Sequence, residues 1–586
     1  MSQSLRGMRT RNRACSWGRL IGLILAISHI GLAHAQTSTA ADAAAQGLLR
    51  QEQRQQQTQS LVPPGPDELH SAAPASTALG ALPPESPCFV ISTIRFTGVR
   101  SERLSWLMRD LHPVFGQCVG VKGLARIASA LDAHLIALGY ATSRVSFPPQ
   151  DLQDGALTIR LDVGTVAALR LENAQGKPDT AWGTWRNAFP TGEGDILNIR
   201  DLEQGIEQMD RLRSQAVHTQ ILPGSQSNSS VVIIQRLEAP FVDRIHGGFT
   251  LDNSGNRLLG RPELSAALSL DNPLGLNDIL ALTANSNVEN PSSRHRSQSA
   301  GINYSVPWGY SLLSLSAQTL RYAQMVQGTT AQFLSSGRAR TQQLRLDATI
   351  WRTASTKIGA FSALMARQSN SYLDDVELVV QRRNTVNLDA GLNVSMALPA
   401  GGRLGGFIDY RRGLATFGAQ QDLPMATDGG LTVRPRVTSA SLSWVQPFRA
   451  GGGLWQYALS LRGQTTPDTL VTEDMFSIGD RSTVRGFDGN TVLLAENGYT
   501  VRNDLSRQID LVPGWATAAY VGLDLGRVWG PSAANLIGTR LAGTAVGLKG
   551  QHGHLQLDVA LATPLLRPAG FQTQHLNLYA AATVAF

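Results

Sequence analysis

One arginine in this sequence stands out as a candidate for a specific polar contact. Arg485 lies in the stretch VRGF (484–487), between GDR (479–481) and DGN (488–490). Glycine, aspartate and asparagine on both sides favour a long loop with the arginine at its tip. On an exposed loop this guanidinium would simply be solvated. A guanidinium held away from water needs a carboxylate, because burial without a partner costs several kcal/mol.

A strand that follows the loop offers such a carboxylate. Between residues 519 and 528, apolar residues alternate with glycine and aspartate: Val521, Gly522, Leu523, Asp524, Leu525 and Gly526. This period of two predicts a β-strand, with Asp524 on the face opposite the apolar residues. The two glycines on the face of Asp524 leave room for a bulky group. We therefore predict that Arg485 pairs with Asp524.

Motifs of enzymatic chemistry are missing. The sequence contains neither the G-x-x-x-x-G-K-[ST] stretch of a nucleotide-binding loop nor the G-x-S-x-G stretch of a hydrolase nucleophile. His552 and His554 lie two residues apart without further ligands, which favours surface residues over a metal site. We predict a protein that is not an enzyme and has no catalytic residue, no metal and no cofactor.

The composition is typical of a transmembrane β-barrel. Of 586 residues only 16% are charged, whereas 57 are glycine and 42% are hydrophobic. Beyond the N-terminus no apolar run reaches the 20 or so residues of a helical span. In a barrel strand, alternate residues face lipid and lumen instead.

The formal charge of +7 arises mostly at the N-terminus, where the first 35 residues contain five arginines and no acid. Removing them leaves a nearly neutral chain, which gives no electrostatic reason to expect nucleic-acid binding. Residues 1–35 are predicted to be a secretory signal peptide, with an apolar core from Leu20 to Leu32 and a small-x-small cleavage pattern at 33–35. A retained helical anchor is the alternative, but the core is short for a span.

Two cysteines remain after removal of the signal peptide. Cys15 leaves with that peptide, while Cys88 and Cys118 enter a compartment that oxidises thiols. A disulfide between them is the simplest expectation, and two unpaired buried thiols are the alternative.

The segment before Cys88 has two parts. Residues 36–60 are rich in alanine and glutamine and contain no proline, which predicts one amphiphilic helix, with a disordered tail as the alternative. Residues 61–87 are rich in proline and are predicted to be a linker.

Two strand-helix-strand patterns follow, at residues 88–163 and 164–240, and each predicts a small α/β domain. Strands are expected at 88–96 and 156–163 in the first unit, and at 164–171 and 231–237 in the second. The helices between them are marked by apolar residues at helical spacing: Leu124, Ile127, Ala128, Leu131 and Leu135 in the first unit, and Leu202, Ile206 and Met209 in the second.

Residues 241–586 are predicted to form the barrel. Apolar residues repeatedly alternate with polar ones, as at Leu344, Arg345, Leu346 and Asp347. A soluble sandwich could alternate too, but charges on the inner face of many strands favour a water-filled barrel. Strand length alone allows 14 to 18 strands. The last strand alternates as well and ends on Phe586.

Three stretches, in order, resemble the transporters of bacterial two-partner secretion, the TpsB family of ShlB/FhaC/HecB-like haemolysin secretion/activation proteins. They are VRGF (Val484, Arg485, Gly486, Phe487), ENGY-x-VRND (with Glu496, Asn497, Gly498, Arg502 and Asn503) and GLDLGRV (with Asp524). The resemblance implies a barrel of about 16 antiparallel strands, two periplasmic POTRA domains at 88–163 and 164–240, and an N-terminal helix at 36–60 that plugs the pore. It also implies an inward loop whose Arg485 contacts Asp524 on the barrel wall.

The resemblance further implies a function. Such a transporter lies in the lipid of the outer membrane as a single barrel. Its POTRA domains bind the N-terminal secretion domain of one exoprotein, which is exported largely unfolded and without nucleotide hydrolysis. A barrel-assembly insertase of the same superfamily and a passive porin are the alternatives. The sequence does not choose among adhesin, haemolysin, toxin and haem-acquisition exoproteins as the partner.

Overall fold

The computed structural model describes residues 79–180, 182–238, 240–255, 257–327 and 331–586. The predicted signal peptide (1–35), the predicted plug helix (36–60) and most of the predicted linker (61–87) lie outside these residues. Within the described ranges, no helix is both long and apolar enough to cross a membrane.

The first α/β unit contains a three-stranded sheet and one long helix. Its elements are β1 (Phe89–Val90), β2 (Thr93–Thr97), η1 (Ser101–Val114), β3 (Cys118–Val119), α3 (Val121–Ala137), β4 (Arg144–Ser146) and β5 (Ala156–Asp162). The sheet order is β2-β5-β4. The α3 residues Ile127, Leu131 and Leu135 are fully buried, as their helical spacing predicts. The continuous strand predicted over 88–96 is wrong: it is broken between β1 and β2, because Ser92 and Thr93 both donate their N–H to Gly155.

The second unit repeats this plan with longer strands. It contains β6 (Thr165–Asn173), α4 (Ile199–Asp210), β7 (Gln215–Pro223) and β8 (Ser229–Glu238). The sheet order is β6-β8-β7, with β7 at one edge. The side chain of Asn198 accepts a hydrogen bond from the Arg200 N–H and so caps the start of α4. Strand β7 is an addition to the predicted pattern.

Cys88 and Cys118 form a disulfide in the structure. It joins the residue before β1 to β3, which are paired antiparallel. Both strands have only two residues, so the covalent bond holds a junction that backbone hydrogen bonds alone would hold weakly.

Replacing both cysteines by serine is expected to destabilise the first unit by about 3 to 4 kcal/mol, because the disulfide restricts the unfolded chain. Limited proteolysis of the full chain across a urea series measures this. We expect the first unit to be cleaved at lower urea in the double variant, with cleavage of the second unit unchanged. Equal urea midpoints for the first unit in both proteins would count against this stabilisation.

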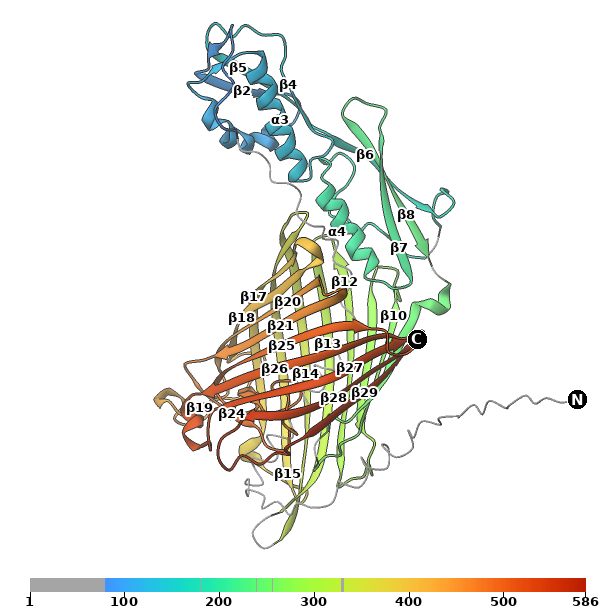
Figure 1. The fold of residues 1–586 in the computed structure, drawn as a ribbon, viewed down its shortest axis with the longest axis vertical. Coiled ribbons are helices and arrows are strands. Elements are labelled where there is room, and N and C mark those ends of the chain that lie inside the picture. Colours follow the sequence, from blue (N-terminus) through green and yellow to red (C-terminus); the bar gives the residue numbers. More distant parts are fainter. Residues whose placement is uncertain (1–78, 181, 239, 256, 328–330) are drawn as a thin grey trace, which may run out of the picture. The chain divides into compact units, whose positions relative to one another are not determined.

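Residues 245–585 form a closed antiparallel barrel of 16 long strands, which confirms the predicted number (Figure 1). The strands are β9 (Ile245–Asp252), β10 (Glu263–Asp271), β11 (Ile279–Asn287), β12 (Arg296–Trp308), β13 (Ser311–Gln327), β14 (Gln332–Arg352), β15 (Thr356–Leu373), β17 (Arg383–Ala397), β18 (Arg403–Leu414), β20 (Arg436–Ala450), β21 (Gly453–Thr465), β25 (Asn497–Ile509), β26 (Ala516–Trp529), β27 (Arg540–His552), β28 (Leu555–Leu566) and β29 (Asn577–Ala585).

Shorter elements lie in the connections. They are η2 (Phe241–Arg244), β16 (Val376–Glu377), η3 (Val379–Gln381), η4 (Pro399–Gly401), η5 (Ala426–Asp428), β19 (Leu431–Thr432), β22 (Thr469–Leu470), η6 (Thr472–Asp474), β23 (Phe476–Ile478), β24 (Leu493–Ala495) and η7 (Pro531–Asn535).

The two faces of the barrel strands differ as the sequence predicts. Leu344 and Leu346 on β14 are 45% and 48% exposed on the outer face, while Arg345 and Asp347 between them face inward and bind each other. Exposed leucine on the outside and paired charges inside suit a strand between lipid and a polar lumen.

Chain continuity defines the two ends of the barrel. Because β9 follows directly from the second α/β unit, its start lies at the end where that unit joins. Antiparallel order then places the turn at 353–355 at this same end, and the connection from β21 to β25 at the opposite end. Strand β29 pairs with β9 and closes the barrel.

Candidate functional site: the inward loop

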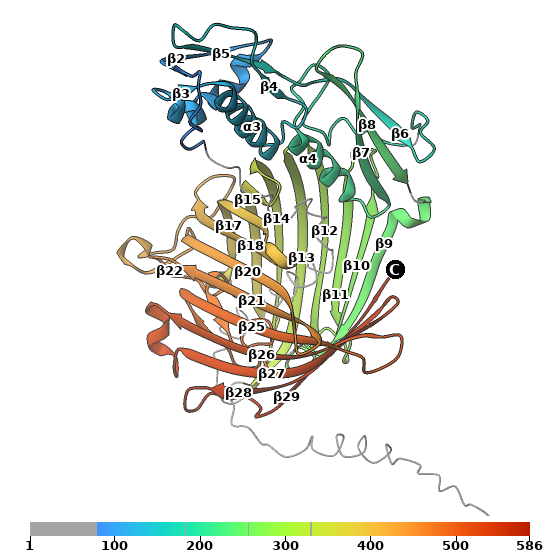
Figure 2. The ribbon, with the colours of Figure 1, turned by 45° about the horizontal axis from the view of Figure 1, so that its top comes forward.

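The connection between β21 and β25, residues 466–496, folds against the inner wall of the barrel. Its strands β23 and β24 pair with each other, beside the strands β25 and β26 shown in Figure 2. Val484 and Phe487 are fully buried. They belong to an apolar cluster that also contains Leu541 of β27 and Phe571, and the rings of Phe487 and Phe571 meet edge to face at 5.5 Å. Apolar packing therefore holds the loop on both sides of Arg485.

Arg485 binds Asp524 of β26 through three hydrogen bonds. Its Nε donates to Asp524 Oδ2 at 2.7 Å, its Nη2 to Oδ1 at 2.6 Å, and its backbone N–H to Oδ2 at 2.9 Å. Asp524 is fully buried and Arg485 is 5% exposed. The structure thus brings the two predicted residues together in the bidentate geometry that makes such pairs strong and directional.

A second carboxylate completes the surroundings of the guanidinium. Arg485 Nη1 donates to Asp504 Oδ1 of β25 at 2.6 Å, and Arg502 Nε lies 3.7 Å from Asp524 Oδ2. Two arginines and two aspartates therefore share this part of the wall. Removing one partner would leave a buried charge uncompensated, which typically costs 3 to 5 kcal/mol.

Glycines on the wall make room for the loop. A Cβ at Gly522 would lie 2.3 Å from Arg485 Nη2, and one at Gly526 would lie 2.9 Å from Val484. The room predicted beside Asp524 is therefore filled by the loop itself. Gly486 has φ +105°, and a Cβ there would lie 2.4 Å from a backbone oxygen of β28. The residue after the arginine thus needs glycine for both conformation and space.

Among these glycines, Gly543 of β27 lies closest to the loop: a Cβ there would lie 1.8 Å from the backbone oxygen of Arg485. The change Gly543→Ala is expected to push the loop off the wall and to reduce export of the partner protein at least about fivefold, as a loss of the loop's contacts of about 1 kcal/mol or more implies. Gly463→Ala is the matched control, because its Cβ would meet no atom closer than 3.5 Å. Quantitative immunoblots of secreted partner measure both variants, and equal export from both would contradict the role of this contact.

The last strand provides contacts that the sequence did not reveal. The Tyr579 hydroxyl donates to the Phe487 carbonyl oxygen at 2.7 Å and accepts from the Gly486 N–H at 3.0 Å. Asn577 Nδ2 donates to the Gly486 carbonyl oxygen at 2.7 Å. Both residues alternate with the apolar outer residues of β29, so their inward direction could have been predicted, but not their partners.

The other residues of the predicted motif support the base of the loop. Glu496 is fully buried and accepts from the Ser532 hydroxyl at 2.5 Å. Asn497 Oδ1 accepts from the Thr466 N–H at 2.7 Å, and Arg502 Nη1 donates to the Ser482 carbonyl oxygen at 2.7 Å. A Cβ on Gly498 would meet the ring of Phe476.

Asn503 is placed differently. Its side chain faces the outer side of β25 and accepts from the Tyr457 hydroxyl at 2.7 Å. Only its backbone oxygen reaches Arg485, at 3.3 Å from Nη2. The structure therefore does not bring this side chain to the site.

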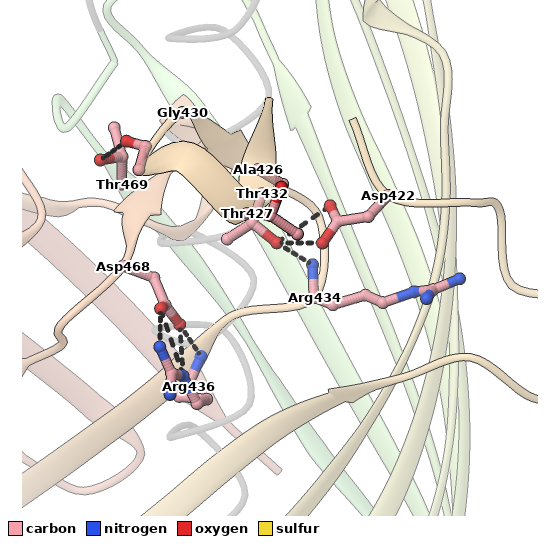
Figure 3. A pocket seen from close by; sticks show the side chains of 10 residues that line it. Asp422, Ala426, Thr427, Gly430, Thr432, Arg434, Arg436, Asp468 and Thr469 are labelled. Carbon is pink, nitrogen blue, oxygen red and sulfur yellow. Dashed lines mark hydrogen bonds and ion pairs between the residues drawn. The ribbon is translucent and has the colours of Figure 1, made fainter. Parts of the chain in front are cut away.

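A small polar pocket lies among the connections at the same end of the barrel (Figure 3). Its volume is about 170 Å³, below the several hundred Å³ of typical small-molecule sites. Asp422 is bound by the Thr432 hydroxyl, and Asp468 by Arg436. The carboxylates of Asp422 and Asp468 thus already have hydrogen-bond partners within the chain, and because the cavity is also small, we assign no ligand to the pocket.

The fold and the loop together define a class of protein. A closed barrel with an apolar outer face, two preceding α/β units and an arginine-tipped inner loop describes an outer-membrane transport barrel with POTRA domains. Family models agree: the ShlB-type POTRA domain matches residues 89–164, and a further POTRA model matches residues 165–223.

The comparisons also identify the family. The model of the haemolysin secretion/activation protein ShlB/FhaC/HecB matches residues 228–550. The outer membrane transporter CdiB-2 of Burkholderia pseudomallei (strain 1026b) is 34% identical over 574 residues, 93% of this chain and 95% of that relative. The hemolysin transporter protein ShlB of Serratia marcescens is 28% identical over 492 residues, 83% of this chain and 84% of that protein. The solved structure of CdiB from Escherichia coli has a TM-score of 0.76 and 28% identity, and covers 94% of this chain and 100% of that one.

The chain belongs to the ShlB/FhaC/HecB family of haemolysin secretion/activation proteins. It is a two-partner secretion transporter of the outer membrane with periplasmic POTRA domains, it secretes a partner exoprotein, and it is not an enzyme. This assignment confirms the predicted family, fold, location and function. The alternatives of a barrel-assembly insertase and a passive porin therefore no longer apply.

Proposed function

We propose that this transporter exports one large exoprotein as a largely unfolded chain, while Arg485 and Asp524 keep the inward loop in place. The observation that supports this proposal most is the complete burial of Asp524 beneath three hydrogen bonds from Arg485. Releasing the loop would cost several kcal/mol, so the loop keeps one position on the barrel wall. Since the loop occupies part of the barrel interior, the remaining space suits an extended chain better than a folded domain.

The partner enters, in this proposal, by adding an extended segment of its N-terminal secretion domain to β7. Within the described part of the second POTRA domain, β7 forms an edge of the sheet and has nine residues. Four consecutive residues, Gln220 to Pro223, are exposed. An open edge of this length offers backbone donors and acceptors to an incoming strand.

The other sheet edges are less available. The outer edge of β6 is partly occupied, because Gly194 donates its N–H to Val166 and Asp179 donates to Leu171. In the first POTRA domain, β4 has only three residues and β2 has five. On β7 the Val217 N–H is bound by Asp210, but the exposed residues Gln220 to Pro223 lie beyond this contact. Length and this exposed end therefore favour β7.

A photo-crosslinking residue at Gln220 of β7 tests this entry site. Arg170 on β6 is the matched control, because it is also exposed and lies on the other edge of the same sheet. We expect the secretion domain of the partner to be captured at position 220 and not at 170. Capture at 170 alone, or equal capture at both, would contradict the proposal.

We further propose that one copy of the chain suffices for transport. The last strand pairs with the first through five residues from Ala581 to Ala585, and Phe586 continues this pairing through two backbone hydrogen bonds with Gly247. A barrel closed in this way leaves no strand edge to pair with a second copy.

A further inference from the structure

Arginines face each other in pairs on the outer face of the barrel, near its cell-surface end. Arg321 on β13 lies directly opposite Arg338 on β14, and Arg527 on β26 lies directly opposite Arg540 on β27. Arg340 follows two residues after Arg338. All five residues are exposed. At these two separate points of the barrel, neighbouring strands thus place like charges side by side.

The strand register fixes the direction of these side chains. The pairing of β13 with β14 is continuous from Gln332 to Ala348, so Arg338 and Arg340 share the face of Leu344 and Leu346. On β26, Arg527 lies between the exposed apolar residues Leu525 and Trp529 on one face of the strand. The arginines therefore point away from the lumen, toward the surrounding membrane.

Their height matches the boundary of the outer leaflet. Ten residues separate Arg340 from Ile350, an exposed residue close to the periplasmic turn. At about 3.4 Å per residue and a tilt of about 40°, this spans roughly 26 Å along the membrane normal, about the height of a barrel's apolar band. Beside Arg527, the rings of Tyr499 and Trp529 lie 6.1 Å apart on the same outer face, as is typical of an aromatic girdle.

Nothing in the described chain neutralises these pairs. No hydrogen bond or ion pair joins the five side chains to other described residues. Glu377, the acid that influences Arg338, is already bound by Arg382 at 2.6 Å and by Asn370 at 2.6 Å. Like charges directly opposite each other on neighbouring strands repel each other and destabilise the pairing. An anion bound between the arginines would reduce this repulsion.

A third facing pair shows the contrast. Arg412 on β18 lies opposite Arg436 on β20, but there Arg436 binds Asp468 of the same chain at 2.5 Å. This pair carries its own counter-charge. The two other pairs have the same arrangement without one and lie open to the membrane.

We propose that the pairs Arg321–Arg338 and Arg527–Arg540, with Arg340, bind the phosphate groups of the phosphorylated glycolipid in the outer leaflet. Arginine suits this role, because its planar guanidinium binds phosphate oxygens through two parallel hydrogen bonds. Gln298 and Asn370 flank Arg321 and Arg338 in the same cross-strand row and add polar groups for the sugar. Bound glycolipid would fix the depth and tilt of the barrel in the membrane.

Native mass spectrometry of the full chain in mild detergent tests the proposal, with bisphosphorylated lipid A as the probe and dephosphorylated lipid A beside it. The variant is Arg321→Gln/Arg338→Gln/Arg340→Gln. The control removes three exposed arginines elsewhere: Arg294→Gln/Arg403→Gln/Arg449→Gln. We expect the first variant to bind phosphorylated lipid A about tenfold or more weakly than the parent, the control to bind like the parent, and dephosphorylated lipid A to bind weakly to all three.

Heat-modifiable electrophoretic mobility shows that each barrel is folded. Arg527→Gln/Arg540→Gln provides an independent variant of the second pair, which tests the proposal if the triple variant does not fold. Parental binding by a folded variant would overturn the proposal, and so would equal binding of the two lipid A forms. If millimolar inorganic phosphate abolished binding, the site would recognise free phosphate, and the assignment to glycolipid would be wrong.

Discussion

Cells that carry Arg485→Ala are expected to export the partner exoprotein at no more than about a tenth of the parental level, while the barrel still assembles. The change removes three side-chain hydrogen bonds to two aspartates and leaves Asp524, fully buried, without its main counter-charge. Such a loss costs about 3 to 5 kcal/mol, enough to release the loop from its position. Assembly is retained because the strand pairings do not depend on this side chain. Secreted partner is measured in the culture medium.

Arg294→Ala is the matched control for this experiment, because Arg294 is exposed in the connection between β11 and β12. Barrel levels and heat-modifiable mobility are measured in the same cells. If a folded Arg485→Ala barrel exported the partner at the parental level, the contact between Arg485 and the barrel wall would not be needed for transport.

The second prediction is that the two aspartates that bind Arg485 differ in their importance for export. Asp524→Asn is expected to reduce export nearly as strongly as Arg485→Ala, whereas Asp504→Asn reduces it about twofold to threefold. The Asp524 side chain is fully buried and binds through both oxygens, while that of Asp504 is 29% exposed and binds through one. A partly exposed ion pair contributes about 1 kcal/mol or less. Export assays on both variants and their double variant measure the difference, and a larger effect at Asp504 would reverse this ranking.

A reciprocal exchange of Arg485 and Asp524 is a poor test of the same contact. An aspartate at position 485 would face Asp504, which now accepts a hydrogen bond from Arg485 Nη1 at 2.6 Å. It would also lie near the Asn503 backbone oxygen that now accepts from Nη2. We therefore expect the exchanged variant to remain inactive even though the wild-type contact is essential.

The main contact of the site could be predicted because its information is local. Turn residues mark the loop around Arg485, and alternation within one strand places Asp524 on the inner face with glycine on either side. The contacts of Asp504, Tyr579 and Gly543 depend instead on how three further strands are aligned once the barrel closes. No short stretch of sequence records that register, so these residues were missed.

In the fold, too, the features encoded locally were predicted and those that depend on long-range pairing were not. Helical spacing predicted α3 and α4, and alternation predicted the barrel, because each pattern reflects burial within one element. The break between β1 and β2 depends on Gly155, more than 60 residues away in sequence. The position of β7 at an edge likewise depends on its pairing with β8. Long-range hydrogen bonds of this kind leave no mark in a local pattern.

Whether this chain exports one dedicated partner is tested most directly by quantitative mass spectrometry of cells with and without it. The secreted and cell-surface proteins are compared, together with the levels of other outer-membrane barrels. We expect one large exoprotein to disappear from the medium and the surface, while the other barrels keep their levels. Depletion of many barrels at once, or an unchanged set of exported proteins, would contradict the claim that this chain is the dedicated exporter of one partner.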